Sequence, residues 1–261
     1  KAFLAERIDE SDIRDVCADQ IETHDDVRWD TRDQVVVSRR VTRLGAIELS
    51  ESSLTTNNEL MCSAMLEGIR EMGLDSLPWG KEATSLRARS EWLRLQELVG
   101  DDWPNLSDER LLENLEQWLG PFLTGITRRS HLERLELAQM LHALFSYNQL
   151  SLLNRLAPTH HTVPTGSRLP LDYTAGKQPV LAVRLQEMFG ETDSPTAAGG
   201  KVKVLLHLLS PAHRPLAVTG DLSSFWRNAY PEVRKEMRGR YPKHYWAEDP
   251  LTAAPTKRRK K

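Results

Sequence analysis

Hydrophobic spacing changes twice along this 261-residue chain, and each change limits the folds it can adopt. In residues 1–55, short apolar runs alternate with polar turn residues, which is typical of strands. In residues 56–156, apolar side chains recur every three or four positions, which predicts packed helices. From residue 157, short strand-like runs return and lead into an amphipathic helix. The sequence therefore predicts an α+β fold: a small OB-like or meander β segment, a helical bundle, then a mixed β-sheet with a C-terminal helix.

The first β segment is predicted to be built around a hairpin. Strands are expected at Val27–Trp29 and Gln34–Val41, because the polar tetrapeptide Asp30–Asp33 between them suits a tight turn. A third extended run covers Leu44–Leu49, with a bend at Gly45. Both a small barrel and a curled meander fit this pattern. Three or four strands do not close a barrel alone, so we expect a further part upstream.

The helical region is predicted to form a compact bundle. Its first helix carries an apolar stripe from Met61 to Met72 and ends at Gly73, which suits a C-cap. A second stripe comprises Ala88, Trp92, Leu95 and Val99. Further helices are predicted from an N-cap at Ser107, from a capping box of Ser130 with Glu133, and over Tyr147–Leu156.

The last region is predicted to combine a sheet with a helix. Asp221 can cap the final helix, in which Pro231 implies a kink or a restart. The strands expected before it are Thr159–Val163, Arg168–Tyr173, Val180–Leu185, Lys201–Leu209 and Pro215–Val218.

These patterns predict four segments along the chain. They are a partial OB-like β segment at 1–55, a helical region at 56–156, a C-terminal α+β domain at 157–250 and a flexible basic tail at 251–261. The chain begins with Lys1 rather than Met, which suggests that a longer protein continues upstream. Within the first segment, a strand remnant is expected at Ala2–Ala5 and a short helix or turn at Asp9–Ala18.

Composition narrows the class of protein. No apolar run approaches the roughly 18 residues that a membrane span needs. Cys17 and Cys62 are isolated thiols without a Cys-x-x-Cys motif, which favours a reducing cytoplasm and argues against a zinc site. The formal net charge is −2, and the last five residues contribute +5, so the rest of the chain carries −7. A mildly acidic body with local basic patches does not resemble a protein that coats DNA, but it is compatible with RNA held at a defined surface.

No catalytic motif is present in the sequence. The nearest approach to a phosphate-binding loop, Gly199-Gly200-Lys201, lacks the first glycine and the Ser/Thr that follows the lysine. There is no Asp-Glu-x-His motif for Mg²⁺ and no Gly-x-Ser-x-Gly elbow. His160 and His161 are adjacent on a predicted strand and would face opposite sides of the sheet. We therefore expect no catalytic residue, cofactor site or metal site in these 261 residues.

Two clusters combine basic and aromatic side chains, as nucleic-acid-binding surfaces do. The first lies on the β segment; there the alternative is that the tryptophan is core and the arginines balance the acidic stretch 9–26. The second lies at the C-terminal helix; there the alternative is that the aromatics pack while the charges only aid solubility. The candidate nucleic-acid-binding residues are Arg28, Trp29, Arg39, Arg40 and Arg43 in the first cluster and Arg234, Arg238, Arg240, Lys243 and Trp246 in the second.

Several blocks in one order resemble the HrpB family of bacterial DEAH-box helicase-like proteins. The resemblance is strongest in Val180–Gly190, in Leu208–Pro211 and in Arg238–His244, and it departs at Ala247, where proline is expected. Weaker blocks are Asp26–Asp30, Arg43–Ala46, Leu77–Trp79, Glu116–Leu119 and Leu156–His160.

The resemblance implies a DExH-type NTPase with two motor domains, a winged helix, a ratchet-like helical domain and an OB-fold before the family's own C-terminal region. ATP and Mg²⁺ would then bind in the motor domains, which this chain does not contain. The implied partners are RNA and the motor domains of the same protein. The implied role is an accessory region of an ATP-dependent RNA helicase that contacts RNA or braces the motors; the alternative is a protein–protein interaction module of the same NTPase.

Overall fold

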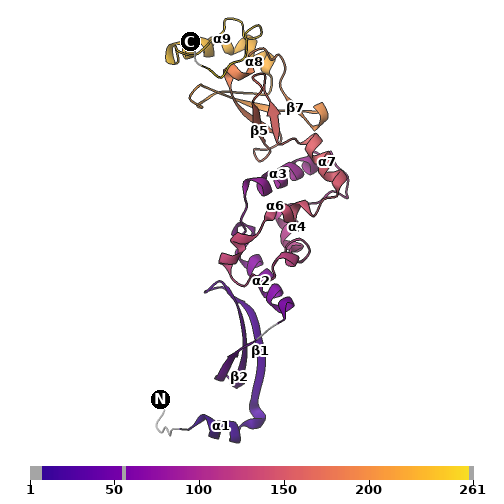
Figure 1. The fold of residues 1–261 in the computed structure, drawn as a ribbon, viewed down its shortest axis with the longest axis vertical. Helices are drawn as coiled ribbons and strands as arrows, with labels where there is room; N and C mark the ends of the chain where they lie inside the picture. The colour runs from indigo at the N-terminus through magenta and orange to yellow at the C-terminus, as the bar shows by residue number, and fades with distance from the viewer. Residues whose placement is uncertain (1–7, 55–56, 259–261) are drawn as a thin grey trace. The chain divides into compact units, whose positions relative to one another are not determined.

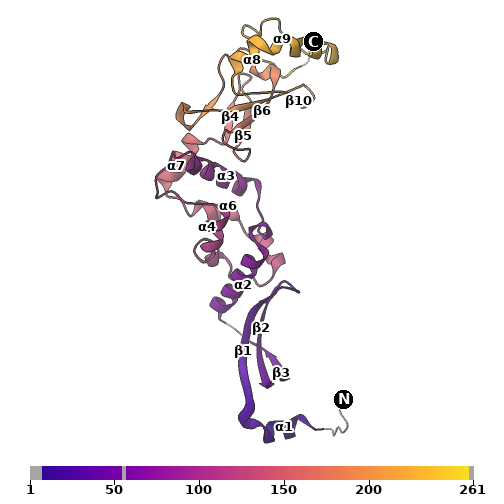
Figure 2. The same cartoon turned by 180° about the vertical axis from the view of Figure 1, so that it is seen from behind.

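The computed structural model describes residues 8–54 and 57–258. The chain forms two compact units, each built from two separate stretches of sequence: 1–79 with 108–140, and 80–107 with 141–261 (Figures 1 and 2). Both helices and strands are present, with a mixed sheet in the second unit, so the predicted α+β class is confirmed. The strand remnant predicted at residues 2–5 and the last three residues of the predicted tail lie outside the described residues. Over the described ranges, every helix is too short or too polar to traverse a lipid bilayer.

The first unit contains a three-stranded antiparallel meander. The strands β1 (Ile21–Asp30), β2 (Val35–Leu44) and β3 (Ile47–Ser53) pair in the order β1-β2-β3, and they follow α1 (Glu10–Val16). Both turns lie where the sequence predicted them, although β1 and β2 extend further than expected. Asp30 Oδ1 accepts the backbone N–H of Asp33 at 2.9 Å, which stabilises the first turn.

The base of this meander packs on helix α2 (Asn58–Met72), which Asn57 caps by accepting the N–H of Glu59. The helix ends at Gly73 with φ +79°, as predicted. Trp29 of β1 lies against Gly68 of α2 so closely that a Cβ on Gly68 would stand 2.7 Å from Trp29 Cε3. The missing side chain of Gly68 therefore makes room for the indole ring.

The helices between residues 108 and 142 correct two predictions. The helix expected after Ser107 is divided at Asn114 into α4 (Asp108–Glu113) and α5 (Leu115–Trp118). The capping box predicted at Ser130 and Glu133 is wrong: residues 129–134 form a 3₁₀ helix, and α6 begins at Leu137 and ends at His142. Leu132 and Leu135 are both buried, and the three-residue 3₁₀ repeat places them on one side.

The second unit begins with α3 (Lys81–Leu95), whose buried face differs from the predicted stripe. Leu95 is 70% exposed, and Val99 lies beyond the end of the helix. The buried face instead includes Arg89, which donates to the carbonyl of Ala157 at 2.5 Å and to the side chain of Asn154. The spacing of apolar residues does not predict this buried face, because Arg89 is polar and is buried together with the oxygen atoms that accept its hydrogen bonds.

Helix α7 of the second unit spans Tyr147–Leu156, which confirms the predicted range. Ser146 and Gln149 form its capping box. It leads into a five-stranded mixed sheet of order β10-β9-β6-β5-β4, in which only β6 and β9 are parallel. The strands are β4 (His160–Thr162), β5 (Arg168–Asp172), β6 (Val180–Arg184), β9 (Leu205–Leu209) and β10 (Pro215–Thr219), with a small hairpin of β7 (Thr196–Ala197) and β8 (Val202–Lys203) in the connection from β6 to β9.

Two C-terminal helices complete the second unit. Asp221 caps α8 (Leu222–Asn228) by accepting the N–H of Ser224 at 2.9 Å. The chain breaks at Ala229 and restarts as α9 (Tyr230–Arg240), as Pro231 predicted. Tyr230 packs edge-on against Phe189 and Trp226, and its hydroxyl donates to the carbonyl of Ala247 at 2.7 Å. These contacts fix the segment that follows α9.

Candidate nucleic-acid interface

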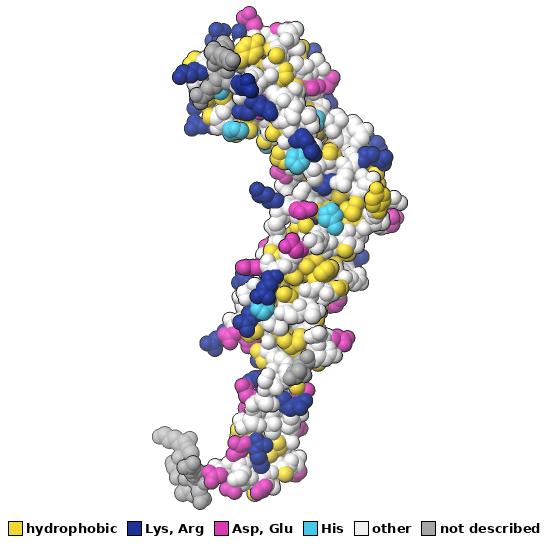
Figure 3. Space-filling view, in the orientation of Figure 1, with side chains coloured by type: hydrophobic (Ala, Val, Ile, Leu, Met, Phe, Trp, Pro, Cys, Tyr) yellow, Lys and Arg dark blue, Asp and Glu magenta, His cyan; other side chains and the backbone are white. Residues whose placement is uncertain are grey.

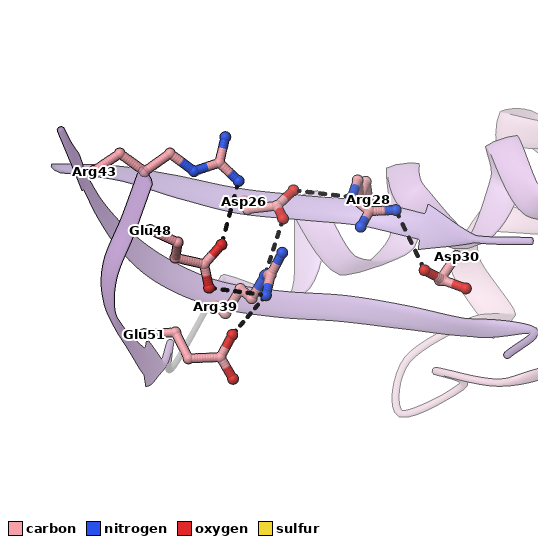
Figure 4. Close-up of polar contacts among 7 residues, drawn as sticks. All are labelled: Asp26, Arg28, Asp30, Arg39, Arg43, Glu48 and Glu51. Atoms are coloured by element: carbon pink, nitrogen blue, oxygen red, sulfur yellow. Dashed lines mark hydrogen bonds and ion pairs between the residues drawn. The ribbon is translucent and has the colours of Figure 1, made fainter. Parts of the chain in front are cut away.

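The arginines of the meander face carboxylates across the strands. The register places Arg39 of β2 opposite Asp26 of β1. Figure 4 shows the result: Arg39 Nε lies 3.1 Å from Asp26 Oδ2, and its Nη1 lies 2.5 Å from Glu51 Oε2 on β3. These hydrogen bonds, that to Glu51 first, raise the pKa of Arg39 above its ordinary value. Arg39 is therefore already held by acids from both neighbouring strands.

The other three candidate arginines of the meander are paired as well. Arg40 bonds both carboxylate oxygens of Asp25, at 2.8 and 3.2 Å, and this contact lowers the pKa of Asp25. Arg28 lies between Asp26 and Asp30, and Arg43 lies 3.5 Å from Glu48. The sign of the charge thus alternates over the meander, and Figure 3 shows blue and magenta side chains intermingled there.

Trp29 is part of the core of the first unit. Only 7% of its surface is exposed, and its ring covers Gly68 of α2. Its indole Nε1 is buried and has no hydrogen-bond partner within the described part of the chain. In this arrangement the ring is not available to stack on a base.

The cations at the end of α9 differ from those of the meander because they have no carboxylate partners in the described part of the chain. Arg238 and Arg240 occupy the last helical turn and Lys243 follows in the next turn of the chain; all three are exposed. None of the three forms an ion pair with any described residue. Figure 3 shows dark blue side chains gathered over the region of α9. Cations in the last turn also complement the helix dipole, which explains their position independently of any ligand.

Two of the C-terminal candidates, Trp246 and Arg234, make contacts within the fold. Trp246 is 5% exposed, and its Nε1 donates to the carbonyl of Tyr241 at 3.0 Å. Arg234 lies 3.2 Å from Glu248 and donates from Nε to the carbonyl of Trp246 at 3.4 Å. Together these contacts hold the segment after α9 against the helix, so that of this cluster Arg238, Arg240 and Lys243 offer free cations to solvent.

Two exposed arginines absent from the predicted set are Arg128 and Arg129. They line a polar pocket of about 470 Å³ beside the turn between β1 and β2. The adjacent pair Arg128-Arg129 is visible in the sequence, but it directly precedes Ser130, where the sequence predicts the start of a helix.

Glu187 is the most buried carboxylate in the second unit and acts as a structural group. Burial opposes its ionisation, but hydrogen bonds from Arg184, Ser167 and Thr165 outweigh burial and lower its pKa. Within residues 8–54 and 57–258, no three His, Cys, Asp or Glu side chains gather as metal ligands. The candidate sites that the described side chains offer are the basic surfaces.

Each of the two clusters lies in a stretch of the chain that matches a known family model. A family model described as the C-terminal part of the HrpB ATP-dependent helicase matches residues 118–250, about half of the chain. The chain belongs to the HrpB family. A second model, the connector region of the HrpB ATP-dependent RNA helicase, matches residues 20–54, which are the meander strands of the first unit.

Characterised HrpB proteins extend this match to the whole chain. The ATP-dependent RNA helicase HrpB of Escherichia coli K12 is 42% identical over 266 aligned residues, which cover 100% of this chain and 32% of that protein. A crystal structure of the E. coli DExH-box NTPase HrpB has a TM-score of 0.73 at 42% identity and covers 97% of this chain and 31% of that one. A crystal structure of the E. coli DEAH/RHA helicase HrpB has a TM-score of 0.64 at 41% identity, over 87% and 29%. The chain thus spans about a third of the length of these HrpB relatives.

Proposed function

We propose that this chain is the accessory C-terminal region of an ATP-dependent RNA helicase of the HrpB type, and that it contacts RNA at the end of α9. The full protein would bind ATP and Mg²⁺ through motor domains outside this chain. The proposed RNA contact is supported by three exposed cations that have no carboxylate partner among the described residues: Arg238, Arg240 and Lys243. Free guanidinium groups can fork onto phosphate oxygens without first breaking an existing pair.

The meander arginines support the contact less well, because each would have to exchange a carboxylate for a phosphate. Exposed ion pairs are weak, so the exchange costs little, but it also gains little. We therefore leave Arg28, Arg39, Arg40 and Arg43 out of the proposed RNA contact, and we assign Trp29 and Trp246 to the support of the fold.

Binding of a labelled single-stranded oligouridylate at two potassium chloride concentrations tests the proposal. The full chain is compared with a version ending at Thr256, because the basic tail alone gives non-specific, salt-sensitive affinity. We expect binding to survive removal of the tail and to weaken in an R238A/R240A/K243A variant whose circular dichroism is unchanged. Undiminished affinity in that folded variant would remove the end of α9 from the RNA contact.

A second candidate role, bracing other domains of the helicase, is favoured by apolar side chains on the first unit. Val16 is 77% exposed and Ile47 is 62% exposed. Arg14 of α1 donates to Ser50 of β3 at 3.2 Å, which holds α1 beside the strand that begins at Ile47. Titration of the chain with the upstream part of an HrpB helicase would test this role. A V16D/I47D variant should bind that part more weakly, and equal affinity would argue against the brace.

A further inference from the structure

The pocket beside the meander turn is built from backbone pairing between two distant segments. Val36 donates its N–H to the carbonyl of Thr127 at 2.7 Å, and Arg129 donates its N–H to the carbonyl of Gln34 at 3.0 Å. Between these two bonds, Val35 and Arg128 form a β-bridge. The segment that carries the arginine pair is thus fixed to the first residues of β2, and the positions of both side chains are set by the fold rather than by a free loop.

Both arginines retain hydrogen-bonding capacity. Arg129 Nη1 donates to the side-chain oxygen of Gln34 at 3.1 Å, which orients the guanidinium and leaves its other N–H groups for a ligand. Arg128 is exposed, and no ion pair to it exists within the described residues. The same holds for Arg32, which lies in the neighbouring turn. The four candidate arginines on the strands of the meander, in contrast, each have a carboxylate partner.

The composition of the pocket points to one class of ligand. Every lining side chain is polar: Asp33, Gln34, Ser76, Arg128, Arg129, Ser130 and Glu133. Protein-binding surfaces depend on aromatic or aliphatic anchors, and the lining has none. Guanidinium and hydroxyl donors are instead the groups that contact the phosphates and sugars of nucleic acids. Two carboxylates in the lining, Asp33 and Glu133, oppose anion binding. We therefore expect the pocket to bind a phosphate group weakly.

We propose that this pocket is a second RNA contact, in which Arg128 and Arg129 bind a backbone phosphate independently of the base sequence. The inference rests on the proposed function, because it takes RNA as the ligand of the region. It goes beyond that function by assigning a phosphate site to the first unit, at residues that neither the basic-aromatic clusters nor the end of α9 include.

Charge-matched variants test the site. R128A/R129A and R28A/R40A each remove two positive charges from the first unit, the former from the pocket and the latter from paired positions on the meander. With a labelled single-stranded oligouridylate, we expect R128A/R129A to weaken binding several-fold. Its plot of log affinity against log salt should be shallower by about 0.7 for each lost phosphate contact. R28A/R40A should change both quantities much less.

A gain of affinity provides a second test that misfolding cannot imitate. Replacing Glu133 by Gln removes a negative charge from the pocket wall and should strengthen binding. Glu59→Gln is the matched control. Glu71, near the end of α2, accepts a hydrogen bond from the hydroxyl of Thr31, so this end of the helix lies beside the turn between β1 and β2. Glu59 lies in the first turn of the same helix, about 18 Å from Glu71 along the helix axis, and is therefore far from that turn.

The outcomes separate the two proposals. If the oligonucleotide binds the wild-type chain but R128A/R129A binds no more weakly than R28A/R40A, the pocket is not an RNA contact and the end of α9 keeps its role. Equal affinity of E133Q and E59Q for the oligonucleotide would also exclude the pocket as an RNA contact. An acidic protein segment would then be the ligand to test at the pocket. If the wild-type chain binds no oligonucleotide, the proposed RNA function fails and this inference fails with it.

Discussion

The strands of the meander and the end of α9 are both rich in arginine, but the candidate arginines on the strands are paired with carboxylates and, among the described residues, those at the end of α9 are not. On the meander, antiparallel pairing places Asp25 opposite Arg40 and Asp26 opposite Arg39, so the cations are neutralised by the strands themselves. At the end of α9, Arg238 and Arg240 lie exposed in the last helical turn and form no ion pair with a described residue. Whether an arginine is free therefore depends on which side chains the register places opposite it, and the density of arginine in the sequence does not reveal this.

The tryptophans of the two regions show that a position among basic residues in the sequence does not make an aromatic ring accessible. Trp29 and Trp246 each stand among basic residues in the sequence, as stacking residues do, and each is buried in the structure. Trp29 fills the space above Gly68, and Trp246 bonds the carbonyl of Tyr241. In both regions the aromatic ring serves the fold, and the difference between the regions lies in their cations.

The largest expected effect concerns these tryptophans. Trp29→Ala and Trp246→Ala should each lower the free energy of unfolding of their own unit by about 3–5 kcal/mol, because a large buried ring is lost. Tyr147→Ala, at a position that is 85% exposed, should change it by less than about 0.5 kcal/mol. Urea denaturation followed by circular dichroism measures all three. Unchanged stability with weaker oligonucleotide binding would reverse the assignment and make the rings stacking residues.

A pair of glycine substitutions should give effects of opposite sign. Gly68→Ala would place a Cβ 2.8 Å from Trp29 Cε2, so we expect a loss of about 1–3 kcal/mol from overpacking. Gly239→Ala, in α9 where nothing lies within 4 Å, should gain about 0.5–1 kcal/mol from helix propensity. Thermal melts of the two variants provide the measurement. A gain at both positions would show that the meander does not rest on α2 through Trp29.

The buried ion pair of the second unit should affect stability in acid. Because the pKa of Glu187 is lower in the folded chain than its ordinary value of 4.5, its stabilising contribution is complete above that value and is lost as the pH falls through the folded-state pKa. We expect Glu187→Gln to flatten the decline of stability below about pH 4.5. Denaturation midpoints across that range measure it. A decline as steep in the variant as in the wild-type chain would exclude Glu187 as a source of acid sensitivity.

The smallest effect is expected for the exposed pairs of the meander. A double-mutant cycle of Arg40→Ala and Asp25→Asn should give a small coupling energy that disappears at high salt, because both side chains are about half exposed. Stability measurements at low and high potassium chloride determine the coupling. A large coupling that resists salt would show that the pairing locks the arginines away from any ligand.

Much of the fold was predictable from local signals. The caps at Gly73 and Asp221, the restart at Pro231 and the bounds of Tyr147–Leu156 follow from short-range chemistry, and the structure confirms them. The failures have a common cause in tertiary contacts. Ser130 and Glu133 form a good capping pattern, yet burial of Leu132 favours a 3₁₀ turn there.

The candidate site was predictable only as a collection of residue types. The sequence shows the arginines, but which carboxylate each one meets depends on strand register, which a one-residue slip would change completely. The pocket at Arg128 and Arg129 depends on pairing with Gln34 and Val36, more than ninety positions away in the chain. No short-range pattern encodes such a contact.

The most direct test of the contrast between paired and free arginines is the salt dependence of oligouridylate binding by two charge-matched variants, R238A/R240A and R28A/R40A, in the chain that ends at Thr256. We predict that R238A/R240A lowers the affinity and makes the slope of log affinity against log salt shallower by about 0.7 per lost phosphate contact, while R28A/R40A stays close to the parent chain. Equal losses in both variants would contradict it, because paired and free arginines would then contribute alike.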